Sequence, residues 1–196
     1  MLKKYISIIG LLIILFCQCY GQNYNTTITP ERIILNLTVN SSSSMAVTWR
    51  TADAVKNPQV LYAEAGDWIE FAKNAKTLDA TSEKVQLDTK QNVCYYSAIM
   101  NELKPNKIYT YRVGGDSVWS EWNQFITAEN NNAPFKFVFF GDPQNDLKEH
   151  VSRVFREAFM KVPEAKFWLF SGDMTSEPED EQWEELFYAA GFIFRT

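Results

Sequence analysis

Several features that are common in proteins are scarce in this sequence, and each scarcity excludes a class of function. The 196 residues include three cysteines and one histidine. Basic residues are outnumbered by acidic ones, 19 to 24, which gives a net charge of −5. This balance argues against a nucleic-acid groove and against a polybasic membrane-binding patch. A hydrophobic content of 46%, with 15% aromatic residues, is enough for a core and excludes wholesale disorder.

Long apolar runs are also scarce, and the one at the start predicts an export signal. Residues 6–16 are apolar and follow Lys3 and Lys4. The run is short for a bilayer span, which needs about 20 residues. A basic start, an apolar centre and the small residue Gly21 are typical of a signal peptide over residues 1–21. We therefore expect a secreted, periplasmic or cell-surface protein with no stable membrane span.

The use of cysteine depends on the fate of that segment. Cys17 and Cys19 lie within it, so lipidation at either one is an alternative to cleavage, and a retained anchor is a third. Cleavage would leave Cys94 alone, and one cysteine cannot form an internal disulfide. The mature fold must then depend on packing. Cys94 lies in an alternating strand pattern and is predicted to be a small buried hydrophobic residue.

Residues 29–128 are predicted to form a β-sandwich. Short segments of strand character recur between turn residues, with no long helical period among them. The Ser-rich turn at residues 40–44 precedes a clear alternation of apolar and polar residues, in which Trp49 is a predicted core residue. The predicted strands cover residues 32–39, 45–50, 60–62, 85–87, 93–100, 108–113 and 124–126.

Two motifs in this region resemble known families. Residues 103–109 (LKPNKIY) are similar to the tyrosine corner of fibronectin type III-like sandwiches, where a tyrosine hydroxyl, here that of Tyr109, bonds to the backbone. Residues 109–127 are similar to the N-terminal domain of purple acid phosphatases. Exposed aromatic residues leave an alternative open, a non-catalytic secreted module that binds a glycan or a protein. The candidates are Trp68, Trp119 and Trp122.

The linker expected at residues 129–134 leads into a second region, residues 135–196, with two matching phrases. Each is an apolar strand closed by Gly-Asp, ending at Asp142 and at Asp173. A helical period separates them, so the order is strand, helix, strand. Parallel neighbouring strands would bring both aspartates to one sheet edge, where α/β folds place their sites. We expect strands buried on both faces and half of a metal-binding cluster. The alternative is that both aspartates only cap helices or close turns.

The second region resembles the calcineurin-like metallophosphoesterases. Gly141-Asp142-x-Gln144 is similar to a variant of their first motif, and Gly172-Asp173 is similar to the second. The resemblance implies that Asp142 binds one metal and that Asp173 bridges both metals. It also implies a dinuclear centre of iron with zinc, manganese or iron, and a phosphate monoester substrate. Phosphodiesters or nucleotides remain alternative substrates, and no catalytic residue is assigned.

Two positions depart from the pattern of these relatives. Ser176 stands where purple enzymes have a tyrosine ligand, so no iron–tyrosinate colour is expected. Gln144 replaces the histidine of many relatives, as a weak ligand or as a hydrogen-bonding neighbour. His150 is predicted to be a helix-surface residue. The family's later histidine motifs have no counterpart here, which predicts an inactive fragment that lacks the C-terminal half of an α/β metallophosphoesterase domain.

Overall fold

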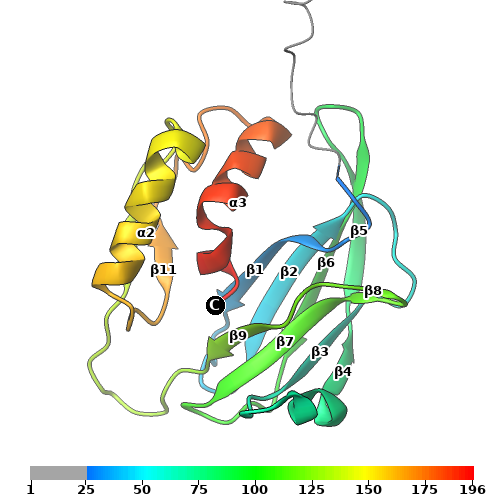
Figure 1. Ribbon diagram of the computed structural model, residues 1–196, viewed down its shortest axis with the longest axis vertical. Helices are drawn as coiled ribbons and strands as arrows, with labels where there is room; N and C mark the ends of the chain where they lie inside the picture. Colours follow the sequence, from blue (N-terminus) through cyan, green and yellow to red (C-terminus); the bar gives the residue numbers. More distant parts are fainter. Residues whose placement is uncertain (1–25) are drawn as a thin grey trace, which may run out of the picture.

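The computed structural model describes residues 26–196 (Figure 1). The predicted signal peptide, with Cys17 and Cys19, therefore lies outside the described residues. Among residues 26–196, no helix combines the length and the apolar character that a membrane crossing requires.

The first part of the chain is a sandwich of two antiparallel sheets. One sheet has the order β1-β2-β6-β5, and the other has the order β4-β3-β7-β8, with β9 also paired to β7. A short 3-10 helix, η1 (Ile69–Asn74), precedes β4. The strands are β1 Glu31–Leu37, β2 Met45–Thr51, β3 Gln59–Glu64, β4 Lys76–Asp79, β5 Thr81–Gln86, β6 Asn92–Met100, β7 Ile108–Gly115, β8 Val118–Trp119 and β9 Asn123–Ile126. The seven predicted strands are all present, while β4 and β8 were not predicted.

The core of the sandwich lies where the alternating pattern of β2 predicts it. Trp49 is only 1% exposed and stacks on Tyr96, with ring centroids 5.2 Å apart. Cys94 is a buried free thiol, as predicted. The hydroxyl of Tyr109 accepts a hydrogen bond of 2.9 Å from the backbone N–H of Lys104, which confirms the tyrosine corner.

The second part is a small α/β unit that follows a connection, residues 127–137, without helix or strand. Strands β10 (Val138–Phe140) and β11 (Trp168–Phe170) pair in parallel. Between them lie a π-helical turn, η2 (Leu147–Val151), and helix α2 (Ser152–Lys161). Helix α3 (Asp180–Phe194) completes the unit. The predicted order of a β-sandwich followed by a partial α/β domain is therefore confirmed.

The prediction that the two parallel strands are buried on both faces is wrong. Phe140 and Trp168 pack against the helices, and the Phe140 ring lies 4.9 Å from that of Phe155. On the opposite face, Phe139 is 59% exposed and Leu169 is 47% exposed. Both helices lie on one side of this two-stranded sheet, and nothing among residues 26–196 covers the other side.

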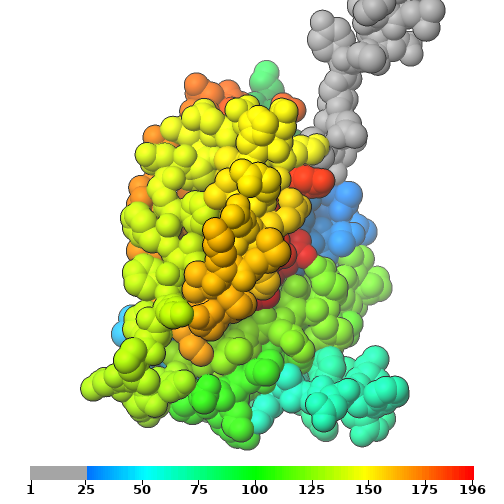
Figure 2. Space-filling view, turned by 60° about the vertical axis from the view of Figure 1, so that its left-hand side comes forward, coloured from blue at the N-terminus to red at the C-terminus, as the bar shows by residue number. Residues whose placement is uncertain are grey.

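Helix α3 lies between the sandwich and the rest of the α/β part. In Figure 2 its red atoms show as a narrow strip between the yellow and gold segment around α2 and the blue and green strands of the sandwich. Its buried residues Leu186, Ala190 and Ile193 join one cluster with Leu147 and Phe155. The helix also packs against β1. The two parts are therefore joined by a helix that belongs to the second.

Tyr111 joins the sandwich to the end of α3. Its side chain is fully buried, and its hydroxyl donates a hydrogen bond of 2.9 Å to the carbonyl oxygen of Arg195. The Arg195 guanidinium pairs with Glu121. Burial raises the pKa of Tyr111 well above its usual value, outweighing the charge of Arg195, which lowers it. The hydroxyl therefore stays protonated in the folded state.

We expect Tyr111→Phe to reduce the loss of stability that the protein shows at alkaline pH. Since the folded-state pKa is raised above 10.0, the unfolded state releases this proton first, and the free energy of unfolding falls as the pH passes that value. Phenylalanine cannot ionise, so the variant should lose about 1 kcal/mol at neutral pH for the missing hydrogen bond. The free energy of unfolding of the variant should decline less steeply above pH 10 than that of the wild type. Urea unfolding across this range measures both slopes, and equal slopes would contradict the assignment.

Candidate metal site at the strand ends

The parallel pairing of β10 and β11 brings the two Gly-Asp phrases together. Phe140 pairs with Phe170, so both strands end at the same edge of the sheet. Immediately beyond, the N–H of Ser171 donates a hydrogen bond of 3.0 Å to the carbonyl oxygen of Phe140. The loops that carry Asp142 and Asp173 therefore begin side by side, at the carboxyl ends where α/β folds place ligands.

Both aspartates adopt a backbone conformation that is uncommon for residues other than glycine. The φ angle of Asp142 is 46° and that of Asp173 is 42°, in the left-handed region. Non-glycine residues seldom adopt this conformation, although aspartate tolerates it better than most, and such residues gather at functional sites. Gly172, with φ of 105°, supplies the sharper turn before Asp173. Both loops thus turn at their aspartates, Asp142 two residues after the end of β10 and Asp173 three residues after the end of β11.

Side-chain hydrogen bonds connect the loops to each other. The side-chain N–H of Gln144 donates to Oδ2 of Asp173 over 3.1 Å. The hydroxyl of Ser176 donates to the carbonyl oxygen of Gln144 over 3.2 Å. The first of these bonds makes Gln144 a hydrogen-bonding neighbour of Asp173, and its alternative role as a weak metal ligand stays a prediction. Ser176, at the position of the purple enzymes' tyrosine, fixes the first loop against the second.

The chemistry of the donor set suits one side of a hard-metal site. Asp142 and Asp173 are exposed carboxylates, the ligand type that iron, manganese and zinc accept. Among residues 26–196, no group of three or more His, Cys, Asp or Glu side chains is placed to hold a metal. His150 lies on η2 with 68% of its side chain exposed, near Glu149, as predicted for a surface residue. The assignment of Asp142 and Asp173 as ligands remains a prediction.

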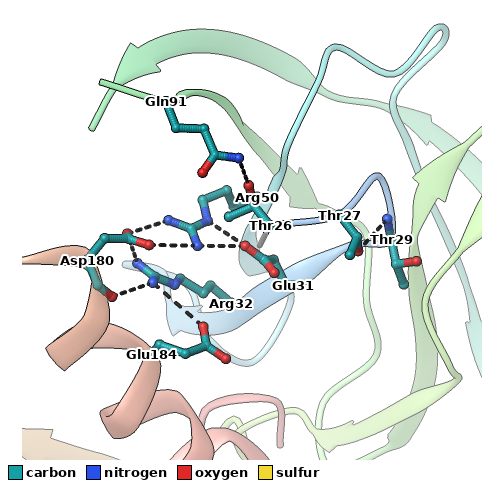
Figure 3. A network of polar contacts seen from close by, with 9 residues as sticks. All are labelled: Thr26, Thr27, Thr29, Glu31, Arg32, Arg50, Gln91, Asp180 and Glu184. Carbon is teal, nitrogen blue, oxygen red and sulfur yellow. Dashed lines mark hydrogen bonds and ion pairs between the residues drawn. The ribbon is translucent and has the colours of Figure 1, made fainter. Parts of the chain in front are cut away.

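Sequence reasoning missed a buried ionic cluster between the sandwich and α3, which we name the Asp180 cluster (Figure 3). Its five members are Glu31, Arg32, Arg50, Asp180 and Glu184. Asp180 is the first residue of α3. Its Oδ1 atom lies 2.6 Å from Nη1 of Arg50 and 2.7 Å from Nη1 of Arg32. Arg32 also donates to the carbonyl oxygen of Asp180 over 2.8 Å.

The arginines of the Asp180 cluster are almost inaccessible. The Arg50 side chain is 1% exposed and that of Arg32 is 5% exposed. Burial alone would lower the pKa of Arg50, but its hydrogen bond to Asp180 and the charges of Glu31 and Asp180 outweigh burial and raise it. For Glu31 the balance is reversed, because burial raises its pKa more than Arg50 lowers it. Both arginines reach the carboxylate of Asp180, which is the partner that the two buried charges share.

Of the three tryptophans predicted as exposed binding candidates, Trp68 alone has a largely exposed side chain. The guanidinium of Arg112 lies between the rings of Trp119 and Trp122, 4.8 Å from each centroid. Those two rings are half-buried. Trp68 is 75% exposed, beside Ile69 at 66%. The binding-module alternative therefore depends on the surface around Trp68.

The sequence of the sandwich has matches among known proteins. The sequence model described as purple acid phosphatase, N-terminal domain, matches residues 30–127, about half of the chain. An uncharacterized protein in two strains of Mycobacterium tuberculosis is 28% identical over 103 residues, covering 53% of this chain and 19% of that protein.

A solved structure extends the likeness beyond the sandwich. Purple acid phosphatase PPD1 from yellow lupin (Lupinus luteus) seeds superposes with a TM-score of 0.70 and 16% sequence identity. The match covers 86% of this chain and 34% of that chain. The present chain thus spans about a fifth of the mycobacterial proteins and about a third of the lupin protein, with a common fold over both of its parts.

Proposed function

Because the chain belongs to the purple acid phosphatase N-terminal domain family, we propose that it is the N-terminal portion of a secreted, metal-dependent phosphatase. The substrate would be a phosphate monoester, and the 196 residues would be inactive without the rest of the parent protein. Signal-directed export, from the basic and apolar start of the sequence, is part of the same proposal. The family membership rests on residues 30–127.

One observation carries the catalytic part of the proposal. The parallel pairing of β10 and β11 delivers two exposed aspartates to one sheet edge, directly behind a sandwich of the matching family. Asp142 would bind one metal through its carboxylate. Asp173 would be the ligand shared by both metals of a pair. A dinuclear centre, when bound, supplies a hydroxide nucleophile and holds the phosphoryl oxygens.

The neighbouring residues of the chain would orient these ligands. Gln144 holds Oδ2 of Asp173 by a hydrogen bond of 3.1 Å, which limits the rotation of that carboxylate. Such outer partners of metal ligands typically change metal affinity by about 10- to 100-fold. Ser176 cannot supply a tyrosinate ligand, so the proposed enzyme would lack the purple colour.

The uncovered face of the parallel sheet supports the proposal that more of the domain belongs here. Exposed apolar side chains lie along both strands on this face: Phe137 is 47% exposed, Phe139 59% and Leu169 47%. In α/β folds both faces of a parallel sheet are covered. We propose that the missing C-terminal half of the α/β domain covers this face and supplies the remaining metal ligands.

The test is to express the gene together with the coding sequence that follows codon 196. We expect the product to hydrolyse p-nitrophenyl phosphate after loading with iron and zinc or with manganese. Removal of the metals by a chelator should abolish this activity, and metal addition should restore it. The 196-residue chain serves as the matched control and should be inactive. An extended, folded and metal-loaded product without phosphatase activity would refute the proposal.

A further inference from the structure

Helix α3 connects the Asp180 cluster to the loop of Asp173. Asp180 lies seven residues after Asp173, and the short segment between them has one side-chain brace. The Oε1 atom of Gln182, in the first turn of α3, accepts hydrogen bonds from the N–H groups of Ser176 and Glu177 at 2.8 and 3.1 Å. The segment that follows Asp173 is thereby tied to the first turn of α3.

The sandwich determines where that first turn lies. Arg32 and Arg50 come from β1 and β2, and both reach the carboxylate of Asp180. Arg32 also contacts Glu184, one helical turn further along, at 3.7 Å, and lies 5.7 Å from the Phe187 ring centroid. The guanidinium charges of Arg32 and Arg50 lie at the N-terminal end of α3, which is the positive end of the helix dipole. The negative charge of the Asp180 carboxylate offsets the resulting repulsion. The start of α3 is therefore held in position and in rotation.

We propose that Arg32 and Arg50 are positioning residues for the metal-binding loop, acting through Asp180 and Gln182 on Asp173. The path continues from Ser176 to the carbonyl oxygen of Gln144, whose side chain bonds Asp173. Fixing one end of α3 thus fixes the loops of both aspartates relative to the sandwich. The sandwich thereby contributes to the site although it holds none of the predicted ligands. This inference rests on the proposed function for its metal, but not for its geometry.

Hydrogen exchange of backbone amides tests the geometry without activity or metal. We expect Asp180→Asn to accelerate exchange at Ser176 and Glu177 by about tenfold, the effect of losing one charge-assisted contact in a local opening. Amides of β2 and β6 should exchange as in the wild type. Gln182→Ala removes the side-chain acceptor and therefore gives the exchange rate of the loop without these two hydrogen bonds. Gln182→Glu keeps an acceptor, so its exchange rates should resemble those of the wild type.

A milder pair of variants covers the case in which Asp180→Asn does not fold. Arg32→Lys keeps the charge but loses the two-point contact with Asp180, and should accelerate exchange in the same loop. Arg153→Lys is its matched control, because the Arg153–Glu157 pair on α2 is exposed. Unchanged loop exchange in folded Arg32→Lys and Asp180→Asn would overturn the inference. Equal acceleration in the loop and in β2 would also overturn it, because it would show only global destabilisation.

Manganese binding to the same chain separates this inference from the proposed function. We expect weak binding that Asp173→Asn removes, and an affinity about tenfold lower in Arg32→Lys than in Arg153→Lys. Binding that is insensitive to both Asp142→Asn and Asp173→Asn would count against the proposed site alone, while the exchange rates still decide the positioning role. Asp173-dependent binding that is equal in Arg32→Lys and Arg153→Lys would overturn the positioning role and leave the proposed function standing.

Discussion

Asp173→Asn should lower the phosphatase activity of the extended gene product at least about a hundredfold. The carboxylate of Asp173 carries a negative charge shared by two oxygens that can bind metal, whereas asparagine offers one neutral carbonyl oxygen. The substitution keeps the size of the side chain and an acceptor for the N–H of Gln144, so the loop should retain its shape. Steady-state hydrolysis of p-nitrophenyl phosphate and the metal content of the purified protein measure the effect. Both should fall together.

Asp146→Asn is the matched control for this experiment. Asp146 is also an exposed aspartate with a left-handed backbone, φ 51°, and it lies four residues after Asp142 on the same loop. It precedes η2 and is not a predicted ligand. We expect nearly wild-type activity and metal content from this variant. A loss equal to that of Asp173→Asn would show that the loops need acidic residues in general, and the assignment of Asp173 as a bridging ligand would be wrong.

Trp49→Ala should lower the free energy of unfolding by about 4 kcal/mol, the usual cost of deleting a buried tryptophan side chain. Trp49 is 1% exposed at the centre of β2, and its ring stacks on Tyr96. Truncation to alanine removes this contact and leaves a cavity between the two sheets. Urea or thermal unfolding of the chain measures the change. A variant that loses less than about 1 kcal/mol would show that Trp49 is not a principal core residue.

Trp49→Phe is the control that separates packing from polarity. The indole N–H of Trp49 is buried and has no hydrogen-bond partner among the described residues. An unsatisfied buried donor costs about 1–3 kcal/mol, so its removal should offset much of the lost packing. We expect Trp49→Phe to cost clearly less than Trp49→Ala. Equal costs would indicate that the N–H contributes to stability through a contact that the structure does not show.

The sandwich was predictable from the sequence because its signal is local. Met45–Thr51 alternates apolar and polar residues, and this period of two assigns Trp49 to the core within a single strand. The tyrosine corner joins two residues only five positions apart, Lys104 and Tyr109. The Gly-Asp phrases were equally legible, because each directly follows a short apolar strand. Their parallel pairing then followed from the helix between them.

The Asp180 cluster was not predictable, because its partners are far apart in the chain. Arg50 and Asp180 are separated by 130 residues, and Arg32 and Asp180 by 148. In the strand alternation Arg50 reads as an outward, solvated residue, yet α3 covers it. Burial of an arginine depends on whether another element lies over the strand, and no pattern within β2 contains that information.

The sequence by itself determined seven strands of the sandwich, the core residue Trp49 and the two loops that carry the aspartates, because short-range periodicity and turn residues specify them. Only the tertiary structure decided which faces are covered. It buried Arg32 and Arg50 beneath α3, left Phe139 and Leu169 exposed, and joined Gln144 to Asp173. Those outcomes depend on contacts between distant segments, whose free energy is a property of the assembled fold and not of any local pattern.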